Sequence, residues 1–132
     1  MNTRRKNGLV RLLNGVTAAG AGSAIDVSDY KNIILQVYTS GNTIATIKFA
    51  VSYKTTKPDF TSGASATNVY DYVQILPLNA QTALTGSTGI ALSGTDVIKN
   101  YQVQGNLIKW LCPIVSGYSA GTITVELDAS TD

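Results

Sequence analysis

The strongest constraint on the fold is an alternation of apolar and polar residues with a period of two. The final segment GTITVELDA directs Ile123, Val125 and Leu127 to one side, and threonines and acidic residues to the other. No segment keeps a period of 3.6 residues. Alternation between Gly, Asn, Asp or Ser turns is typical of half-buried strands. We therefore predict an all-β protein.

The predicted strands follow one another with short polar breaks. They cover 8–13, 24–27, 31–39, 43–53, 69–77, 89–92, 97–104, 106–115 and 120–128. A chain of 132 residues is long enough for one domain with its own core. We expect a single antiparallel β-sandwich, jelly-roll-like, over 14–132, preceded by an extended basic N-terminal arm over 1–13.

Two segments share a pattern: NIILQVYTSGNTIATIKF from Asn32 and NLIKWLCPIVSGYSAGTITVEL from Asn106. Each has an apolar strand, Ser-Gly, a short turn and a Thr-Ile alternation. Glycine supplies the positive φ that tight turns need. The pattern predicts two matching positions in the sheets.

The stretch IATIKFAVSY has two unlike faces. One face is Ala45, Ile47, Phe49, Val51 and Tyr53, which we predict in the core. The other is Ile44, Thr46, Lys48, Ala50 and Ser52. Because the strands at 69–77 and 106–115 are apolar on both faces, this second face is predicted to meet another subunit, with Lys48 near the interface or its rim. Trp110 is predicted in the core.

The surface is poor in charge. Charged residues make up 14% of the chain, whereas the usual share is about a quarter. The chain has 11 Ser, 16 Thr and 12 Gly. Neutral hydroxyls cost less to bury than ions. Such a surface suits a protein that packs against partners.

The net charge of +2 belongs to the N-terminus. Beyond residue 11, six lysines stand against eight acids. We predict a protein-binding arm in which GLVRLL adds a strand to a neighbour's sheet. Its residues are Arg4, Arg5, Lys6, Leu9, Val10, Arg11 and Leu12. Phosphate contacts are the alternative, but no aromatic residues interleave for base stacking, so no nucleic acid partner is expected.

No targeting or membrane-spanning segment is expected. The apolar stretch near the N-terminus is interrupted by Arg11, Asn14 and Gly15, which argues against a secretory signal. No run approaches the ~20 apolar residues of a membrane span.

The catalytic inventory is small. The chain has no histidine, so Ser-His-Asp and Cys-His arrangements are excluded. The single Cys112 predicts a buried, inert thiol. The candidate carboxylates are Asp26, Asp29, Asp59, Asp71, Asp96, Glu126 and Asp128, most of them beside turns. DVSD at 26–29 lacks calcium-loop spacing and is predicted to be a turn capped by Ser28 or Asp29. We expect no enzyme, no metal and no cofactor.

Aromatic residues offer a binding surface. Lys48, Tyr70 and Tyr72 are predicted on a partner-binding sheet face. An alternative is that Tyr70, Asp71, Tyr72 and Tyr118 bind carbohydrate. The simplest interpretation of alternating tyrosines on a strand is ordinary sheet packing. The long polar loops 54–68 and 79–96 are predicted to be functional or bound to a partner.

Several phrases resemble small virion structural proteins of tailed bacteriophages. They are LVRLLNGVTAAGAGSAIDVSDYKNIILQVYTSGN, PDFTSGASATNVYDYVQILPLN, GSTGIALSGTD and SGYSAGTITVEL. The resemblance implies a capsid decoration (cement) protein that binds the major capsid protein or other virion proteins, forms a homo-oligomer such as a trimer, and resides in a virion assembled in the bacterial host cytoplasm. The alternative is a tail- or fibre-associated module that binds host-surface carbohydrate. Neither implies a membrane partner.

Overall fold

The computed structural model describes residues 10–105 and 107–130, and it confirms an all-β protein. The strands are β1 (Val10–Val16), β2 (Gly20–Ala21), β3 (Ile25–Asp26), β4 (Asn32–Ser52), β5 (Asp71–Tyr72), β6 (Ile75–Pro77), β7 (Ile90–Thr95), β8 (Ile98–Val103) and β9 (Trp110–Ser130). Within these described ranges, no helix is long and apolar enough to cross a membrane.

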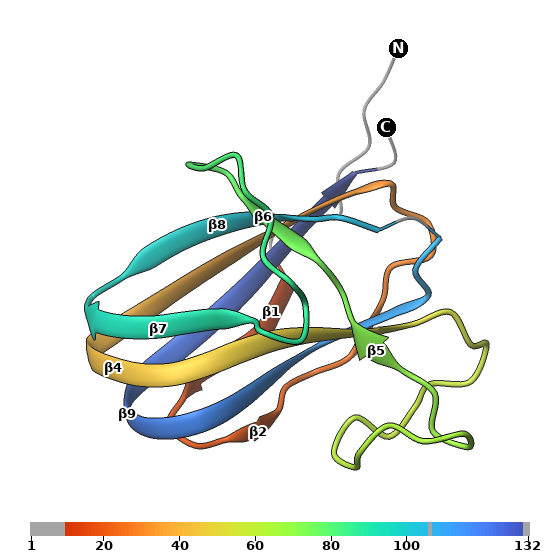
Figure 1. Cartoon of the computed structure of the whole chain (residues 1–132), viewed down its shortest axis with the longest axis horizontal. Helices are drawn as coiled ribbons and strands as arrows, with labels where there is room; N and C mark the ends of the chain where they lie inside the picture. The colour runs from red at the N-terminus through yellow and green to blue at the C-terminus, as the bar shows by residue number, and fades with distance from the viewer. Residues whose placement is uncertain (1–9, 106, 131–132) are drawn as a thin grey trace.

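Two long strands, β4 and β9, organise the molecule. Each has 21 residues, and they pair antiparallel from Asn32 with Ser130 to Ser52 with Trp110. Their register shifts between Ser40 and Thr46. There each strand bends back over itself, as Figure 1 shows. The predicted strands 31–39 and 43–53 are therefore the two halves of β4, and 106–115 and 120–128 correspond to the halves of β9.

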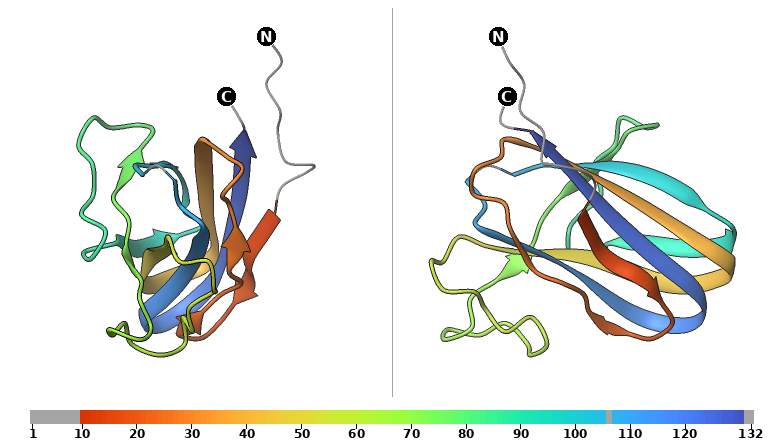
Figure 2. Two further views of the ribbon diagram at one scale, coloured as in Figure 1. Left: turned by 90° about the vertical axis from the view of Figure 1, so that its right-hand side faces the viewer. Right: turned by 180° about the vertical axis from the view of Figure 1, so that it is seen from behind.

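The bends divide the strands into two layers (Figure 2). Sheet I contains β1, residues 122–130 of β9, residues 32–40 of β4, β8 and β6, in that order. Sheet II contains β2 and β3, residues 110–116 of β9 and residues 42–52 of β4, whose far edge pairs with both β7 and β5. β4 and β9 each contribute one half to either sheet. The predicted all-β sandwich is confirmed.

Positive-φ residues make the bends possible. Gly41 in β4 has φ 75°, Gly117 in β9 has φ 58°, and Asp96 between β7 and β8 has φ 52°. The Gly41 N–H donates to the Asp96 carboxylate at 2.8 Å, which ties two bends together. Glycine adopts positive φ without steric cost, and Asp tolerates it better than most residues. The predicted role of the Ser-Gly pairs is confirmed.

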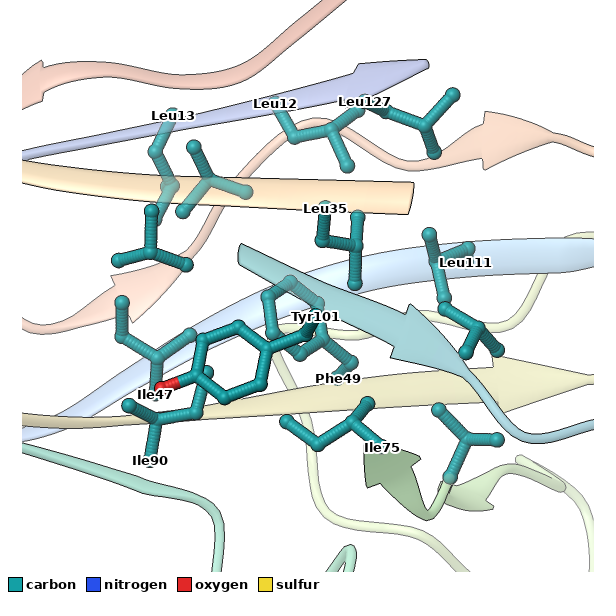
Figure 3. Close-up of a cluster of buried hydrophobic side chains, with 14 of the residues drawn as sticks. Leu12, Leu13, Leu35, Ile47, Phe49, Ile75, Ile90, Tyr101, Leu111 and Leu127 are labelled. Atoms are coloured by element: carbon teal, nitrogen blue, oxygen red, sulfur yellow. The ribbon is translucent and has the colours of Figure 1, made fainter. Parts of the chain in front are cut away.

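The core lies between the sheets and contains the alternate side chains of both (Figure 3). Leu35 and Leu127 come from sheet I, and Ile47 and Phe49 from sheet II; all are at most 1% exposed. Tyr101 is also buried, and burial raises its pKa to about 12. The apolar alternation therefore marked the core correctly along most of β4 and β9.

Candidate functional site

The chain covers part of the outer face of sheet II with its own loop. Ala50 and Cys112 face outward there, opposite each other on β4 and β9, and both are fully buried. Phe60 from loop 53–70 packs on them in a second hydrophobic cluster. Ser52 is also buried, and its hydroxyl donates to the Val69 carbonyl at 2.9 Å. For Ala50 and Ser52, the predicted subunit surface is wrong, because they are small residues beneath the chain's own loop.

Hydrogen bonds within loop 53–70 hold it in shape. The Asp59 N–H donates to Asn68 Oδ1 at 2.8 Å, and Asn68 Nδ2 donates back to the Asp59 carbonyl at 2.8 Å. The Thr61 hydroxyl and then its backbone N–H donate to the Asp59 carboxylate, which holds the pKa of that group below its usual range. The Tyr70 hydroxyl donates to the Ser62 carbonyl at 2.6 Å. The loop is a folded cover, found at the end of the sandwich opposite the bends (Figure 1).

The structure brings together the three residues predicted on the sheet face. The Tyr70 ring lies 5.1 Å from the Phe60 ring and 6.2 Å from the Tyr72 ring, centroid to centroid. Lys48 Nζ lies 5.2 Å from the Tyr72 ring centroid. These aromatic contacts are made within the chain. The position of Lys48 at the rim of a subunit interface stays a prediction.

A groove opens beside this cluster, where β4 ends. It has a volume of about 510 Å³ and is lined by Tyr53, Lys54, Val69 and Asp71, among others. Tyr53 is 61% exposed and Val69 is 43% exposed. The prediction that Tyr53 faces the core is wrong, because the strand ends at Ser52 and the Lys54 N–H bonds to the Ser52 hydroxyl at 3.2 Å. The polar run KTTKP after Tyr53 is the sequence signal for that ending.

The predicted carbohydrate-binding residues do not form one site. Tyr118 belongs to the bend of β9, and its hydroxyl donates to the Gly121 carbonyl at 2.6 Å. Its neighbour Ala120 pairs with Ile44, whereas Tyr72 pairs with Ala50. The rise of about 3.3 Å per strand residue separates these two points of β4 by about 20 Å. Tyr118 therefore lies far from Tyr72.

Trp110 lies on the outer face of sheet II, so its predicted core position is wrong. Its cross-strand partner is Ser52, and it is only half-buried. Its indole nitrogen is buried without a hydrogen-bond partner among the described residues. Lys109 Nζ lies 5.6 Å from the indole ring centroid and 2.7 Å from Asp26 Oδ2. The hydrogen bonds from Lys109 and Ser28 hold the Asp26 pKa well below its usual range.

That aspartate also defines the DVSD turn. The Ser28 N–H donates to Asp26 Oδ1 at 2.9 Å, and the Ser28 hydroxyl donates to the same oxygen at 2.6 Å. The turn was predicted correctly, although the capping acceptor is Asp26. The predicted cap by Ser28 or Asp29 is therefore revised.

The predicted arm divides at Val10. Arg4, Arg5, Lys6 and Leu9 lie outside the described residues. Val10, Arg11 and Leu12 belong to β1, which pairs with β9 of the same chain. Leu12 is 2% exposed and packs in the core between the sheets. The sandwich thus includes residues 10–13, which the sequence assigned to the arm, and Leu12 is not a partner contact in this structure.

One of the carboxylates named from the sequence lies on the outer face of sheet I. Glu126 is 8% exposed and accepts a hydrogen bond from the Tyr38 hydroxyl, which raises the Tyr38 pKa. Arg11 is the cross-strand partner of Glu126. Alternation places Glu126 on the face opposite Ile123, Val125 and Leu127, as the structure confirms. Its burial depends on the neighbouring strands, which local sequence does not reveal.

The single thiol of the chain is buried. Cys112 is buried as predicted, and burial raises the pKa of its thiol to about 11. Among the residues that the structure describes, no group of three or more His, Cys, Asp or Glu could hold a metal ion.

Comparisons with known proteins support the fold. No family model matches the chain, and no curated protein matches it. Among solved structures, the chain is similar to the crystal structure of the SPBc2 prophage-derived protein YomS, with a TM-score of 0.68 and 11% identity. The similarity covers 98% of this chain and 96% of the other. At that identity, it establishes a shared fold.

Proposed function

We propose that this protein is a phage structural protein, a capsid decoration (cement) protein that binds the major capsid lattice and stabilises the head. The observation that supports it most is the fold, which is similar to that of a prophage-derived protein over nearly the whole of both chains. The phrases that resemble small virion proteins point the same way. Since a fold does not fix a function, the surface chemistry must also fit.

The outer face of sheet I has suitable chemistry. Its register places Gln36 and Tyr38 of β4 beside Asn100 and Ile98 of β8. Ile98 is 68% exposed. The part of this face formed by β4 and β8 carries neutral polar and apolar side chains, which lose little free energy when they are desolvated, because few ions must leave water. The charged residues Arg11 and Glu126 lie on the part formed by β1 and β9. This is the face that we assign to the capsid or to a second copy in a trimer.

The proposed mechanism is multivalent binding. Each copy makes a modest contact, and many copies on a lattice add up to a strong restraint. The basic residues Arg4, Arg5 and Lys6 reach a neighbouring subunit. The chain contains no histidine, which fits a binding role and not a catalytic one.

The test is the composition of purified particles of the phage that encodes the chain. We expect mass spectrometry to detect the protein in intact heads, in many copies. Added protein should also co-sediment with heads from a deletion strain and raise their resistance to heat. Absence from both heads and tails would overturn a virion role.

A second candidate is a tail- or fibre-associated module that binds host-surface carbohydrate. The observation that favours it is the exposed Tyr53 ring beside Asp71 in an open groove. Immunogold labelling of intact particles separates the two candidates, because a decoration protein labels the head and a fibre module labels the tail.

A further inference from the structure

We propose that the groove between Tyr53 and Asp71, here called the Tyr53 groove, binds a neutral oligosaccharide. The inference rests on the second candidate function and is independent of the decoration role. It makes Tyr53, in place of Tyr72 and Tyr118, the aromatic ring that contacts the sugar, while Tyr70 and Asp71 still line the groove.

The first argument is the availability of aromatic rings. All seven tyrosines are described, and only Tyr53 is exposed. Tyr70 is packed between Phe60 and Tyr72, and Tyr72 lies under Lys48. A sugar needs a free ring face on which its C–H groups can stack. Tyr53 is the tyrosine that offers one.

The second argument is the set of polar groups that line the groove. The Tyr72 N–H donates to Asp71 Oδ1 at 2.7 Å, which orients the carboxylate. Asp71 Oδ2 accepts no hydrogen bond from the described residues, and it can therefore accept two sugar hydroxyls. Lys54 also lines the groove and adds a positive charge beside it. Because one negative and one positive group line the groove, a neutral ligand fits its charge better than an anion does.

The third argument is that the walls are already fixed. Ser52 accepts the Lys54 N–H and donates to the Val69 carbonyl, so one buried hydroxyl joins both sides. Binding therefore requires little ordering of the protein. The volume of about 510 Å³ lies within the range of small-molecule sites.

A protein side chain is the competing occupant. The Tyr53 and Val69 side chains are apolar enough to receive one. An apolar partner, however, would bury Asp71 and Lys54 without polar partners, at a considerable desolvation cost. Sugar hydroxyls satisfy both groups. The chemistry therefore favours the oligosaccharide.

The experiment is a titration of the whole purified chain with maltotriose, cellotriose and tri-N-acetylchitotriose, followed by amide NMR shifts. We expect at least one trisaccharide to shift the amides of Tyr53, Val69 and Asp71 and to saturate below about 20 mM. Tyr53→Ala should weaken binding about tenfold or more, whereas Tyr53→Trp should retain it. Asp71→Asn should weaken it about fivefold. Leu78→Ala, at an exposed apolar residue that does not line the groove, is the matched control and should bind normally.

Four outcomes would overturn the inference. One is no saturable shift with any of the three sugars. Another is unchanged affinity in Tyr53→Ala with a native amide spectrum. The third is that Tyr53 signals move with protein concentration and not with sugar, which would assign the groove to a second copy. Poly(glycerol phosphate) tests the charge argument, because binding that depends on Lys54 and not on Tyr53 would exclude a neutral ligand. None of these outcomes bears on particle location, so a failure here is distinct from a failure of either proposed function.

Discussion

Gly121 shows how one residue limits the approach of two strands. A Cβ atom there would lie 2.0 Å from the Thr43 hydroxyl oxygen, and the backbone φ is +95°. Thr43 is fully buried in β4, so it has no room to move away. The bend of β9 can lie this close to the bend of β4 only because residue 121 has no side chain.

Gly121→Ala should lower the free energy of unfolding by about 2–4 kcal/mol, from backbone strain and steric overlap together. Gly41→Ala separates the two causes, because its φ is +75° but nothing lies within 4 Å of the added Cβ; it should cost about 1 kcal/mol. Gly63→Ala meets nothing within 4 Å and has an ordinary φ, so it should change stability by less than about 0.5 kcal/mol. Urea denaturation measures all three. Equal losses of free energy of unfolding in Gly121→Ala and Gly41→Ala would show that the surrounding structure shifts to remove the overlap with Thr43.

Tyr101 makes stability depend on alkaline pH. Burial raises its pKa to about 12, whereas an unfolded tyrosine ionises near about pH 10. Its stabilising contribution is therefore complete below about pH 10 and is lost as the pH rises towards 12. Between about pH 8 and 11, the wild type should lose about 1.4 kcal/mol more than Tyr101→Phe. Urea unfolding at both pH values tests this, and parallel losses in the two proteins would contradict it.

At the scale of elements, loop 53–70 is a small structural unit attached to sheet II. Phe60 is its main buried anchor, and it lies on Ala50 and Cys112. Cys112 is the single cysteine of the chain, so its thiol reports whether the loop is closed. The main core between the sheets does not contain Phe60. Loss of this anchor should therefore open the loop without unfolding the sandwich.

Phe60→Ala should raise the rate of Cys112 modification by a thiol reagent about tenfold or more at neutral pH, while strand content stays native. Phe60→Leu keeps an apolar anchor and should react at close to the wild-type rate. Stopped-flow absorbance and circular dichroism give the two readouts. If Phe60→Ala instead lowers the free energy of unfolding of the whole chain by several kcal/mol, the loop is part of the main cooperative unit.

The strands could be predicted from sequence, whereas the covering of their faces could not. Ile47 and Phe49 alternate with Lys48 and Ala50, and alternation is a local property that the sequence displays directly. The burial of Ala50 depends on Phe60, ten residues further along the chain, packing back over the strand. Alternation also predicts Tyr53 in the core. β4 ends at Ser52, one residue earlier, so the Tyr53 ring is exposed. Loop packing is a long-range property, and the candidate groove depends on it.

At the scale of the whole molecule, the two ends of the sandwich differ. The bends of β4 and β9 and the turn between β7 and β8 gather at one end, where the Val97 N–H donates to the Thr39 hydroxyl at 2.9 Å. Loop 53–70 and the Tyr53 groove lie at the opposite end. One end is therefore closed by continuous strands, and the other presents loops. Binding residues usually lie on loops held by a rigid scaffold, so the loop end is where the ligand proposed above is expected to bind.

The role of the basic N-terminus can be tested, because Arg4, Arg5 and Lys6 precede β1, the first strand of the sandwich. Deleting residues 2–8 removes Arg4, Arg5 and Lys6 but leaves β1, which begins at Val10. We expect this variant to keep its urea midpoint, because it loses no described core residue, and to lose co-sedimentation with heads at about 0.15 M salt. Deleting residues 2–13 also removes Leu12 and Leu13, which are 2% and 4% exposed, and should cost several kcal/mol of stability, about 2–5 for each leucine. Replacing Arg4, Arg5 and Lys6 with serine controls for length and should reproduce the binding loss. Wild-type binding by the folded 2–8 deletion would remove the N-terminus from the proposed mechanism and leave sheet I as the contact surface.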